Sequence, residues 1–364
     1  MIKSLKAKEI LNSRGNLTVE VELKTDKGVF KASVPSGASR GKHEAVEIMA
    51  AKAVKNINDV ICPKLKNRNE AKQKEIDELM IKLDGTENKS RLGANAILPV
   101  SIAVCRAGAV AKNLPLWKYI SQISKIKPSL PKPCVLFIEG GLHAKNKLDI
   151  QEFMVVGEFN KAKKIYQKLG KILGADVGLE GGFVSLVSET EQALDSIMEA
   201  AKGYDIRIGL DCAASHLKKE KYTVDFYSSL VKKYPIIFLE DPFGEEDWKQ
   251  WTLLKPKTKA LIIGDDLTVT NKKRLKKAIK ENCIHGLVVK PNQIGTITET
   301  LECVKIAKRA KLKIMVSHRA ADTLDDFIAD LAVGVGADFI KSGGPTKPER
   351  LAKYNRLLKI ENEL

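Results

Sequence analysis

The alternation of apolar and polar residues predicts that the chain opens with a β-sheet. From Leu17 to Leu23 every second residue is apolar, and Val29 and Phe30 follow a Lys-Gly turn. A period of two places these side chains on one face of a strand, and the turn predicts a β-hairpin. The segment 34–45, VPSGASRGKHEA, is too rich in Gly and Ser for a strand or helix, and helical patterns then run to about Tyr119. These patterns predict an α+β domain.

The chain changes character at residues 125–133, KIKPSLPKP, where three prolines occur in nine positions. Proline fixes φ and lacks a backbone N–H, so this segment cannot form regular structure. We therefore predict an N-terminal α+β domain over residues 1–124, a linker over 125–133 and a second domain over 134–364.

Beyond the linker, short apolar runs recur, each ending in a polar residue and each followed by a helical stretch. The clearest are RIGLDCA, PIIFLED, LIIGDD, LVVKPN, KIMVSHR and DFIKSG, whose terminal polar residues lie 23 to 29 residues apart. CVLFIE (134–139) and EFMVVG (152–157) bring the number of strands to eight. This spacing predicts an α/β fold, a TIM-type (β/α)8 barrel with its site at the C-terminal strand ends. A doubly wound open sheet is the alternative, but no GxGxxG follows any strand.

Composition narrows the class of protein. The 364 residues are 44% hydrophobic and 29% charged, as in ordinary folded proteins. The longest mostly apolar run, Ala94–Cys105, contains Pro99 and is shorter than the roughly 20 residues of a membrane span. No secretion signal opens the chain, so we expect no membrane partner and a cytoplasmic location. The six widely spaced cysteines are expected to be reduced, buried thiols.

The net charge of +17 attracts anions of any size. Nucleic acid is a poor candidate partner, because no zinc-finger spacing, RNA-recognition motif or aromatic-rich basic stripe is present. The surplus lysines fit a solvated surface better.

Three predicted strands in succession end in an acidic residue, namely Asp211, Glu240 and Asp265. In a barrel these carboxylates point into one mouth, where they repel one another unless a cation intervenes. Hard oxygen ligands of this kind suit Mg²⁺. One such residue alone would be explained as a helix cap, but three in register predict a magnesium site.

The next three strands end in basic residues, at Lys290, at His318 with Arg319, and at Lys341. The mouth is thus predicted to have an acidic and a basic half, which suits an anionic substrate that chelates metal and presents phosphate or carboxylate to cations. A lysine near metal ions and other cations should have a lowered pKa, so Lys290 is a candidate proton-abstracting base.

Motifs along the whole chain resemble those of the enolases (phosphopyruvate hydratases). The matching stretches are EILNSRGNLTVEVEL, VPSGASRGKHEA, DGTENKSRLGANAILPVSIAVCRA, GGLHAKNKLDIQEFM, GLDCAAS, FLEDPF, GDDLTVTN, VKPNQIGTITET, VSHRAADTLDDFIADLAVG and KSGGPTKPERLAKYNRLLKIENEL. The chain resembles a short, divergent member of this family. The resemblance implies an N-terminal capping domain on a modified barrel in which an early strand runs antiparallel.

The same resemblance implies two Mg²⁺ ions in each active site. Asp211, Glu240 and Asp265 would ligate the first, and Ser39, in a loop that closes over the substrate, would ligate the second, which arrives with the substrate.

For catalysis, the resemblance implies that Lys290 removes the C2 proton of 2-phosphoglycerate. Glu180, with Glu152 beside it, would protonate the departing C3 hydroxyl. The substrate and its phosphate and carboxylate would be held by His143, Gln151, His318, Arg319, Lys341 and Ser39.

The sequence departs from the family near this site. Leu179 replaces an acidic neighbour of Glu180, and Ala320 removes a hydroxyl that contacts phosphate in the family, a hydrogen bond of about 1.5 to 3 kcal/mol. Further departures are Ala321, Glu139, Pro291 and Arg40, and the chain is shorter than is usual. Two alternatives to a working enolase therefore remain: an enolase-like paralogue acting on another small carboxylate, and a non-catalytic anion-binding or nucleic-acid-binding protein. The resemblance makes a homodimer the minimum expected assembly.

Overall fold

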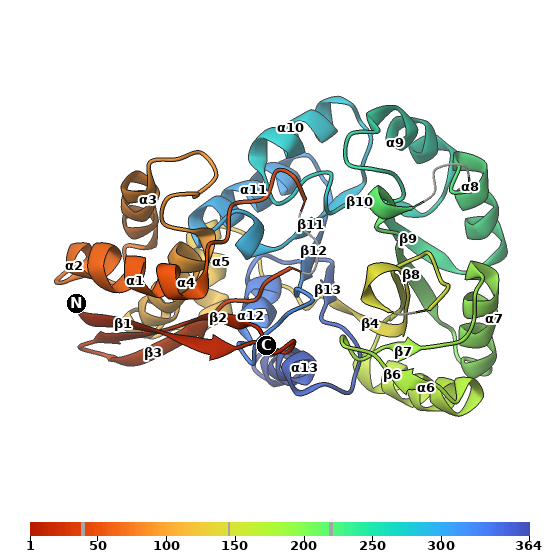
Figure 1. The fold of residues 1–364 in the computed structure, drawn as a ribbon, viewed down its shortest axis with the longest axis horizontal. Coiled ribbons are helices and arrows are strands. Elements are labelled where there is room, and N and C mark those ends of the chain that lie inside the picture. Colours follow the sequence, from red (N-terminus) through yellow and green to blue (C-terminus); the bar gives the residue numbers. More distant parts are fainter. Residues whose placement is uncertain (38–40, 145, 218–220) are drawn as a thin grey trace.

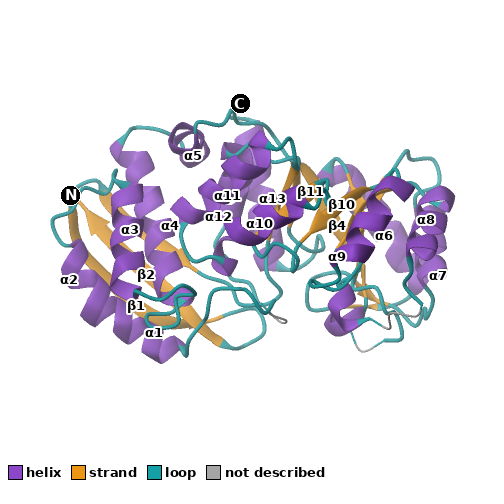
Figure 2. Ribbon diagram, turned by 90° about the horizontal axis from the view of Figure 1, so that it is seen from above, coloured by secondary structure: helices purple, strands orange, loops and turns teal. Residues whose placement is uncertain are grey.

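A computed structural model describes residues 1–37, 41–144, 146–217 and 221–364. The chain forms a small N-terminal sheet covered by helices and, beside it, a ring of strands surrounded by helices (Figures 1 and 2). These two parts correspond to the α+β domain and the barrel that the sequence predicts.

The N-terminal sheet is an antiparallel meander of β1 (Ile2–Leu11), β2 (Leu17–Thr25) and β3 (Gly28–Ser33). The predicted hairpin is confirmed as β2 and β3, with Leu23 opposite Phe30. The alternating residues Val19, Val21 and Leu23 are fully buried against the helices. The apolar residues at every second position of the strand therefore lie on the buried face of the sheet, as the sequence predicted.

Helices cover one face of this sheet (Figure 2). The helices of this domain are α1 (Ala50–Asn56), a π-helical turn η1 (Ile57–Ile61), α2 (Cys62–Leu65), α3 (Gln73–Asp84), α4 (Ala94–Ala111) and α5 (Leu116–Ser124), of which α1, η1, α2 and α4 contact the sheet. Among the described residues α4 alone has the length and hydropathy of a membrane-crossing helix, but 83% of it is buried inside the protein. It packs on β2 and β3 as the core helix of this domain.

The eight predicted strands close into a barrel. They are β4 (Lys132–Glu139), β5 (Glu152–Val156), β8 (Arg207–Asp211), β9 (Ile236–Glu240), β10 (Leu261–Gly264), β11 (Gly286–Val289), β12 (Lys313–Ser317) and β13 (Phe339–Lys341). They are neighbours in that order, and β13 pairs with β4 to close the ring. β5 runs antiparallel to both of its neighbours, which confirms the expectation of an early antiparallel strand. β4 begins inside the predicted linker, whose limits stay a prediction.

Side chains alternate between the interior and the exterior of the barrel. On β4, Leu136 joins an interior cluster with Phe238 and Met315, whereas Val135 and Phe137 face the outer helices. The elements outside the ring are α6 (Phe159–Leu173), β6 (Asp176–Val177), β7 (Phe183–Val184), α7 (Thr190–Ala200), α8 (Val224–Lys233), α9 (Trp248–Leu254), α10 (Lys272–Lys280), α11 (Ile297–Arg309), α12 (Phe327–Gly334) and α13 (Pro348–Glu361). Short 3-10 turns are η2 (Gly141–His143), η3 (Ala214–His216), η4 (Lys255–Lys257) and η5 (Pro291–Gln293).

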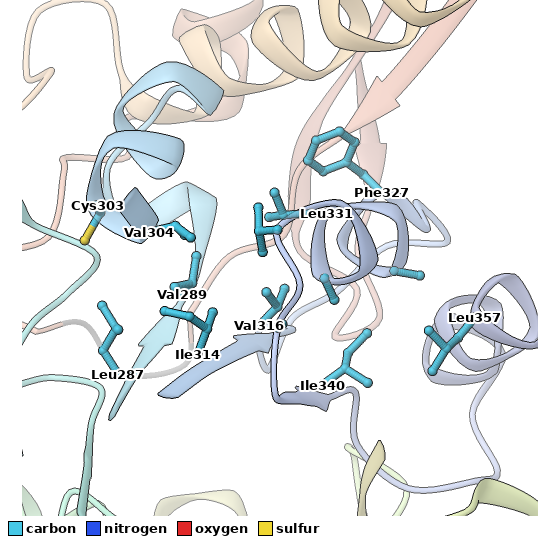
Figure 3. Packing of buried hydrophobic residues seen from close by; sticks show 14 of the residues in the cluster. Leu287, Val289, Cys303, Val304, Ile314, Val316, Phe327, Leu331, Ile340 and Leu357 are labelled. Atoms are coloured by element: carbon cyan, nitrogen blue, oxygen red, sulfur yellow. The ribbon is translucent and has the colours of Figure 1, made fainter. Parts of the chain in front are cut away.

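Figure 3 shows the outer layer, where apolar side chains of β11, β12 and β13 meet those of α11, α12 and α13. Val289 and Val316 are fully buried there with Leu331. A barrel filled on both sides is rigid, so its strand ends hold side chains at fixed positions. All six cysteines are free thiols, and five are buried as expected, whereas Cys62 is only partly buried.

Specific contacts fix the N-terminal domain against the barrel. Arg106 of α4 donates to both oxygens of Asp325, at 2.7 and 2.9 Å. Ser36 and Ala321 form a two-way backbone bridge, with N–O distances of 2.9 and 3.0 Å. The predicted loop over residues 34–45 is thereby joined to the segment that follows β12.

Candidate active site

The C-terminal ends of the barrel strands surround a polar cavity. The predicted site residues that line it are Gln151, Glu152, Glu180, Asp211, Asp265, Lys290, His318, Arg319 and Lys341. Glu240 is fully buried beneath them. Most of these residues converge here because parallel βα units end their strands at one face of a barrel, and Glu152 joins them because the antiparallel β5 begins at that face.

Lys341 is the centre of the acidic group. Its Nζ donates to Asp211 Oδ2 at 2.6 Å and to both oxygens of Glu240 at 3.0 Å, and lies 3.0 Å from Glu152 Oε2. Burial disfavours the ammonium, but the three carboxylates outweigh it and raise the pKa of Lys341 well above its ordinary value. Glu240 resists ionisation in turn, since burial and the charge of Asp211 raise its pKa well above the ordinary value.

Lys290 pairs with the third acidic residue, Asp265. The lowered pKa expected for Lys290 depends on nearby metal ions and stays a prediction; with Asp265 as the direct partner of the amine, the direction is the opposite. Burial opposes the ammonium, but the ion pair with Asp265 outweighs it and raises the pKa. Asp265 itself is held by its neighbours: its backbone N–H donates to Asp241 Oδ1 at 2.8 Å, and its Oδ1 accepts from Gln293 Nε2 at 3.0 Å.

The strands that carry the predicted acidic and basic halves do lie side by side, as β8, β9 and β10 and as β11, β12 and β13, but their side chains do not stay apart. Lys341 and Lys290 reach among the carboxylates, so charges of opposite sign alternate in the mouth. The reason is burial: isolated ionised groups are unfavourable in a closed cavity, and opposite charges pair there.

The donor set fits magnesium. Asp211, Glu240 and Asp265 offer hard carboxylate oxygens, are at most 8% exposed, and end three adjacent strands. The ligand atoms of this trio are not gathered as one cluster, because Asp211 and Glu240 turn to Lys341 whereas Asp265 turns to Lys290.

Among the described residues, two other groups have ligand atoms within 4.8 Å of one another, namely Glu152 with Glu180 and His318, and Asp241 with Asp265 and Asp266. In the second group, Asp241 accepts the backbone N–H groups of Asp265 and Asp266 at 2.8 and 2.7 Å. It therefore anchors the loop that carries Asp265.

Glu180 lies in the turn between β6 and β7, lines the cavity and is 1% exposed. Its Oε2 is 3.5 Å from His318 Nε2, and its Oε1 is 3.8 Å from Arg14 Nη2, which comes from the turn between β1 and β2. Burial raises the pKa of the neighbouring Glu152 to about 8, and Asp211 and Glu180 add to this effect. A proton can therefore be held in this group at neutral pH.

Among the residues that depart from the family pattern, Glu139 has a clear structural consequence. It is fully buried, and its Oε1 accepts the backbone N–H groups of Glu180 at 3.0 Å and Gly182 at 2.8 Å. A Cβ on Gly178 would lie only 2.5 Å from Glu139 Oε2, so the GLEGG loop wraps tightly around this carboxyl group. Burial, together with the charge of Glu180, raises the pKa of Glu139 to about 7. Leu179, by contrast, is 51% exposed and points away from the buried group.

Arg319, the candidate phosphate-binding residue, forms a bidentate ion pair. Its Nη1 and Nη2 donate to the two oxygens of Glu44, at 2.9 and 3.2 Å, and Nη1 also donates to Asn292 at 3.1 Å. Pro291 begins the turn η5 that presents Asn292, a position at which proline costs no hydrogen bond. Ala320 lines the cavity beside Arg319.

Two predicted residues cannot be placed. Ser39 lies outside the described residues, and the side chain of His143 is likewise not described. Gln151 lines the cavity, with Nε2 3.5 Å from Asp211 Oδ2.

Sequence reasoning missed three groups that shape the site, namely Glu44, Arg350 and Arg14. None follows a barrel strand directly, which was the signal that marked the acidic residues Asp211, Glu240 and Asp265 and the basic residues that follow the next three strands. Glu44 follows the VPSGAS loop, and Arg350 lies in the ERLAKYN stretch of the C-terminal helix. Only the resemblance motifs that contain them marked these positions.

Comparison with known proteins agrees with this architecture. The family model "Enolase, N-terminal domain" matches residues 2–120, and "Enolase, C-terminal TIM barrel domain" matches 127–225 and 215–364. Enolase B of Dictyostelium discoideum is 46% identical over 422 aligned residues, covering 100% of this chain and 95% of that protein. The enolase of Mastigamoeba balamuthi is 43% identical over 420, covering 100% and 96%. Both aligned lengths exceed 364, so this chain lacks segments that its relatives have.

Proposed function

The chain belongs to the enolase family, and on that premise we propose how its barrel mouth performs the dehydration of 2-phosphoglycerate to phosphoenolpyruvate. One observation carries the proposal: a single cavity is lined by the Lys290 amine and the Glu180 carboxyl group. A base and an acid that face one substrate are what an elimination of water requires.

In its neutral form, which Mg²⁺ bound by Asp265 would favour by replacing the ammonium as the partner of that carboxylate, Lys290 takes the C2 proton. That proton is barely acidic, because its removal places a second negative charge on the adjacent carboxylate. Lys341 contributes fixed positive charge from a buried position, 3% exposed at the side chain. When bound by Asp211, Glu240 and Asp265, Mg²⁺ supplies further positive charge for the developing dianion.

Glu180 gives a proton to the C3 hydroxyl. The C2–H bond breaks with its proton on Lys290 Nζ, a C2–C3 double bond forms, and the C3–O bond breaks with water as the leaving group. Glu152, whose pKa burial raises to about 8, holds a proton in the same cluster, from which Glu180 can draw it.

The substrate is held at its two anionic ends. Arg319 suits the phosphate, since its planar fork can bind two oxygens at once. Lys341 suits the carboxylate, and Gln151 and His318 line the wall between them. Ser39 and His143 keep the roles that the resemblance implies, as a ligand of a second Mg²⁺ and as a substrate contact.

We also propose a homodimer or higher homo-oligomer and a cytoplasmic location, both of which rest on the family alone. Light scattering coupled to gel filtration tests the assembly. Neither alternative, the paralogue or the polyanion-binding protein, is favoured by any observation.

The test is turnover of 2-phosphoglycerate, followed by the absorbance of phosphoenolpyruvate with saturating Mg²⁺. Lys290→Ala should abolish it. Lys89→Ala is the matched control, because Lys89 is also a buried lysine with one carboxylate partner, Glu299 at 2.6 Å, but lies outside the cavity. Absence of turnover by the unmodified protein, or equal loss in both variants, would contradict the proposal.

A further inference from the structure

The guanidinium group of Arg350, a residue of helix α13, lies behind the wall of the cavity. Nη1 of Arg350 lies 2.5 Å from Nδ1 of His318 and donates to the carbonyl oxygen of Arg319 at 2.7 Å. Nη2 donates to the carbonyl oxygen of Ala320 at 2.7 Å. Arg350 is fully buried and His318 is 3% exposed, so these contacts fix both side chains.

The chemistry of this contact allows one arrangement of protons. A guanidinium has only N–H donors and stays protonated, so the imidazole nitrogen that faces it must offer a lone pair. A neutral ring with a lone pair on Nδ1 carries its hydrogen on Nε2. The Nδ1–H tautomer and the imidazolium would both place N–H against N–H at 2.5 Å.

We propose that Arg350 is a positioning residue that locks His318 as the neutral Nε2–H tautomer. The Nε2–H then points toward Glu180, whose Oε2 is 3.5 Å away, and into the cavity. His318 therefore offers a hydrogen-bond donor at this point and no basic lone pair. Resting on the proposed function, this assigns proton delivery to Glu180 and leaves His318 to orient Glu180 or the departing hydroxyl.

The surroundings agree with a neutral ring. Burial lowers the pKa of His318 well below its ordinary value, and the nearby cations Arg350, Lys341 and Lys290 lower it further. Glu180 is the acidic group that faces Nε2, at a distance longer than a hydrogen bond of normal strength.

A second set of contacts keeps Arg350 in place. Asp322 Oδ2 lies 3.5 Å from Nη1, and Glu349 Oε1 lies 3.5 Å from Nε. Asp322 is also 3.1 Å from Lys353 Nζ. Replacement of Arg350 by methionine therefore leaves Asp322 with a cationic partner, which favours folding of the variant.

The first experiment reads the tautomer directly and needs no catalysis. The chain has five histidines, so ¹⁵N-histidine labelling gives a simple spectrum, and the missing signals of His318→Gln assign His318. We expect one protonated nitrogen, Nε2, and one unprotonated nitrogen, Nδ1, unchanged between pH 6 and 8. An Nδ1–H tautomer or an imidazolium at pH 7 overturns the proposal, whatever the enzyme turns over.

The second experiment compares Arg350→Met with Arg350→Lys. In Arg350→Met the His318 signals should show mixed tautomers, and kcat should fall about 10- to 100-fold, as when other partners that orient an imidazole are lost, with a smaller change in KM. Arg350→Lys restores a donor and should recover most of kcat. Arg356→Met is the control, because Arg356 lies on the same helix but pairs with Asp330.

If His318 keeps its single tautomer in Arg350→Met, the proposal is wrong. If the tautomer changes but kcat does not, the catalytic part of the proposal is wrong. If Arg350→Met does not fold, the spectrum of the unmodified protein decides alone. Loss of enzymatic turnover in the unmodified protein would contradict the proposed function and leave the spectroscopic result intact.

Discussion

Lys341 and Glu240 face each other across the barrel mouth, with Nζ 3.0 Å from both carboxylate oxygens. β13 and β9 are not neighbours in the ring, so the lysine side chain spans the opening. In this contact, the basic residue at the end of β13 pairs with the acidic residue at the end of β9. It also means that a fixed cation balances the carboxylates before any metal ion binds.

Removal of that cation should destabilise the metal-free protein. Lys341→Met leaves buried carboxylates uncompensated and should lower the free energy of unfolding in EDTA by about 3–5 kcal/mol. Added Mg²⁺ should raise the melting temperature of this variant more than that of the unmodified protein. Lys353→Met also removes a buried lysine from a carboxylate, but its loss should not respond to Mg²⁺. Equal responses of the two variants would refute this account of the acidic group.

Glu139 should give the metal-free protein a pH-dependent stability. Its folded pKa of about 7 lies above the unfolded value, so its contribution is present at low pH and is lost as the pH rises toward 7. We compare the free energy of unfolding at pH 5 and at pH 8, measured by urea titration in EDTA. The decrease between these two pH values should be about 2–3 kcal/mol smaller for Glu139→Gln than for the unmodified protein. Glu199→Gln, at an exposed position, should retain the original slope. Parallel slopes for all three proteins would show that Glu139 titrates normally.

For substrate binding, the planar geometry of the Arg319 guanidinium should matter more than its charge. Lys at this position keeps the charge but cannot bind two oxygens in one plane. We expect Arg319→Lys to raise KM for 2-phosphoglycerate about 10-fold or more, which is about 1.4 kcal/mol, with the surface variant Arg309→Lys unchanged. An unaltered KM would remove Arg319 from the phosphate site.

A hydroxyl restored at Ala320 should improve substrate binding. Ala320 lines the cavity beside Arg319, so serine there can donate to the phosphate. Ala320→Ser should lower KM by about 10-fold or more, the range of one hydrogen bond to a charged group. Ala321→Ser should give no such gain, because Ala321 pairs with Ser36 through its backbone. A KM that does not fall would mean that another group already holds the phosphate.

The sequence predicted the fold more completely than the site. Strand ends such as Asp211 and Lys290 follow local patterns, because the barrel repeats one unit at regular spacing and exposes one end of each strand. Charge pairing does not follow local patterns: Lys341 contacts Asp211 from 130 residues away. Arg350 acts through a helix outside the barrel, and no periodicity marks such a residue. The antiparallel direction of β5 came from the resemblance, since the apolar pattern of a strand does not depend on its direction.

The central claim is that Lys290 removes the C2 proton and Glu180 serves the leaving group. Exchange of the C2 hydrogen of 2-phosphoglycerate in D₂O, followed by proton NMR with saturating Mg²⁺, separates these roles. We predict exchange with the unmodified protein and with Glu180→Gln, which cannot complete the elimination, and none with Lys290→Ala. Exchange that persists in Lys290→Ala, or that fails in the unmodified protein, would contradict the account.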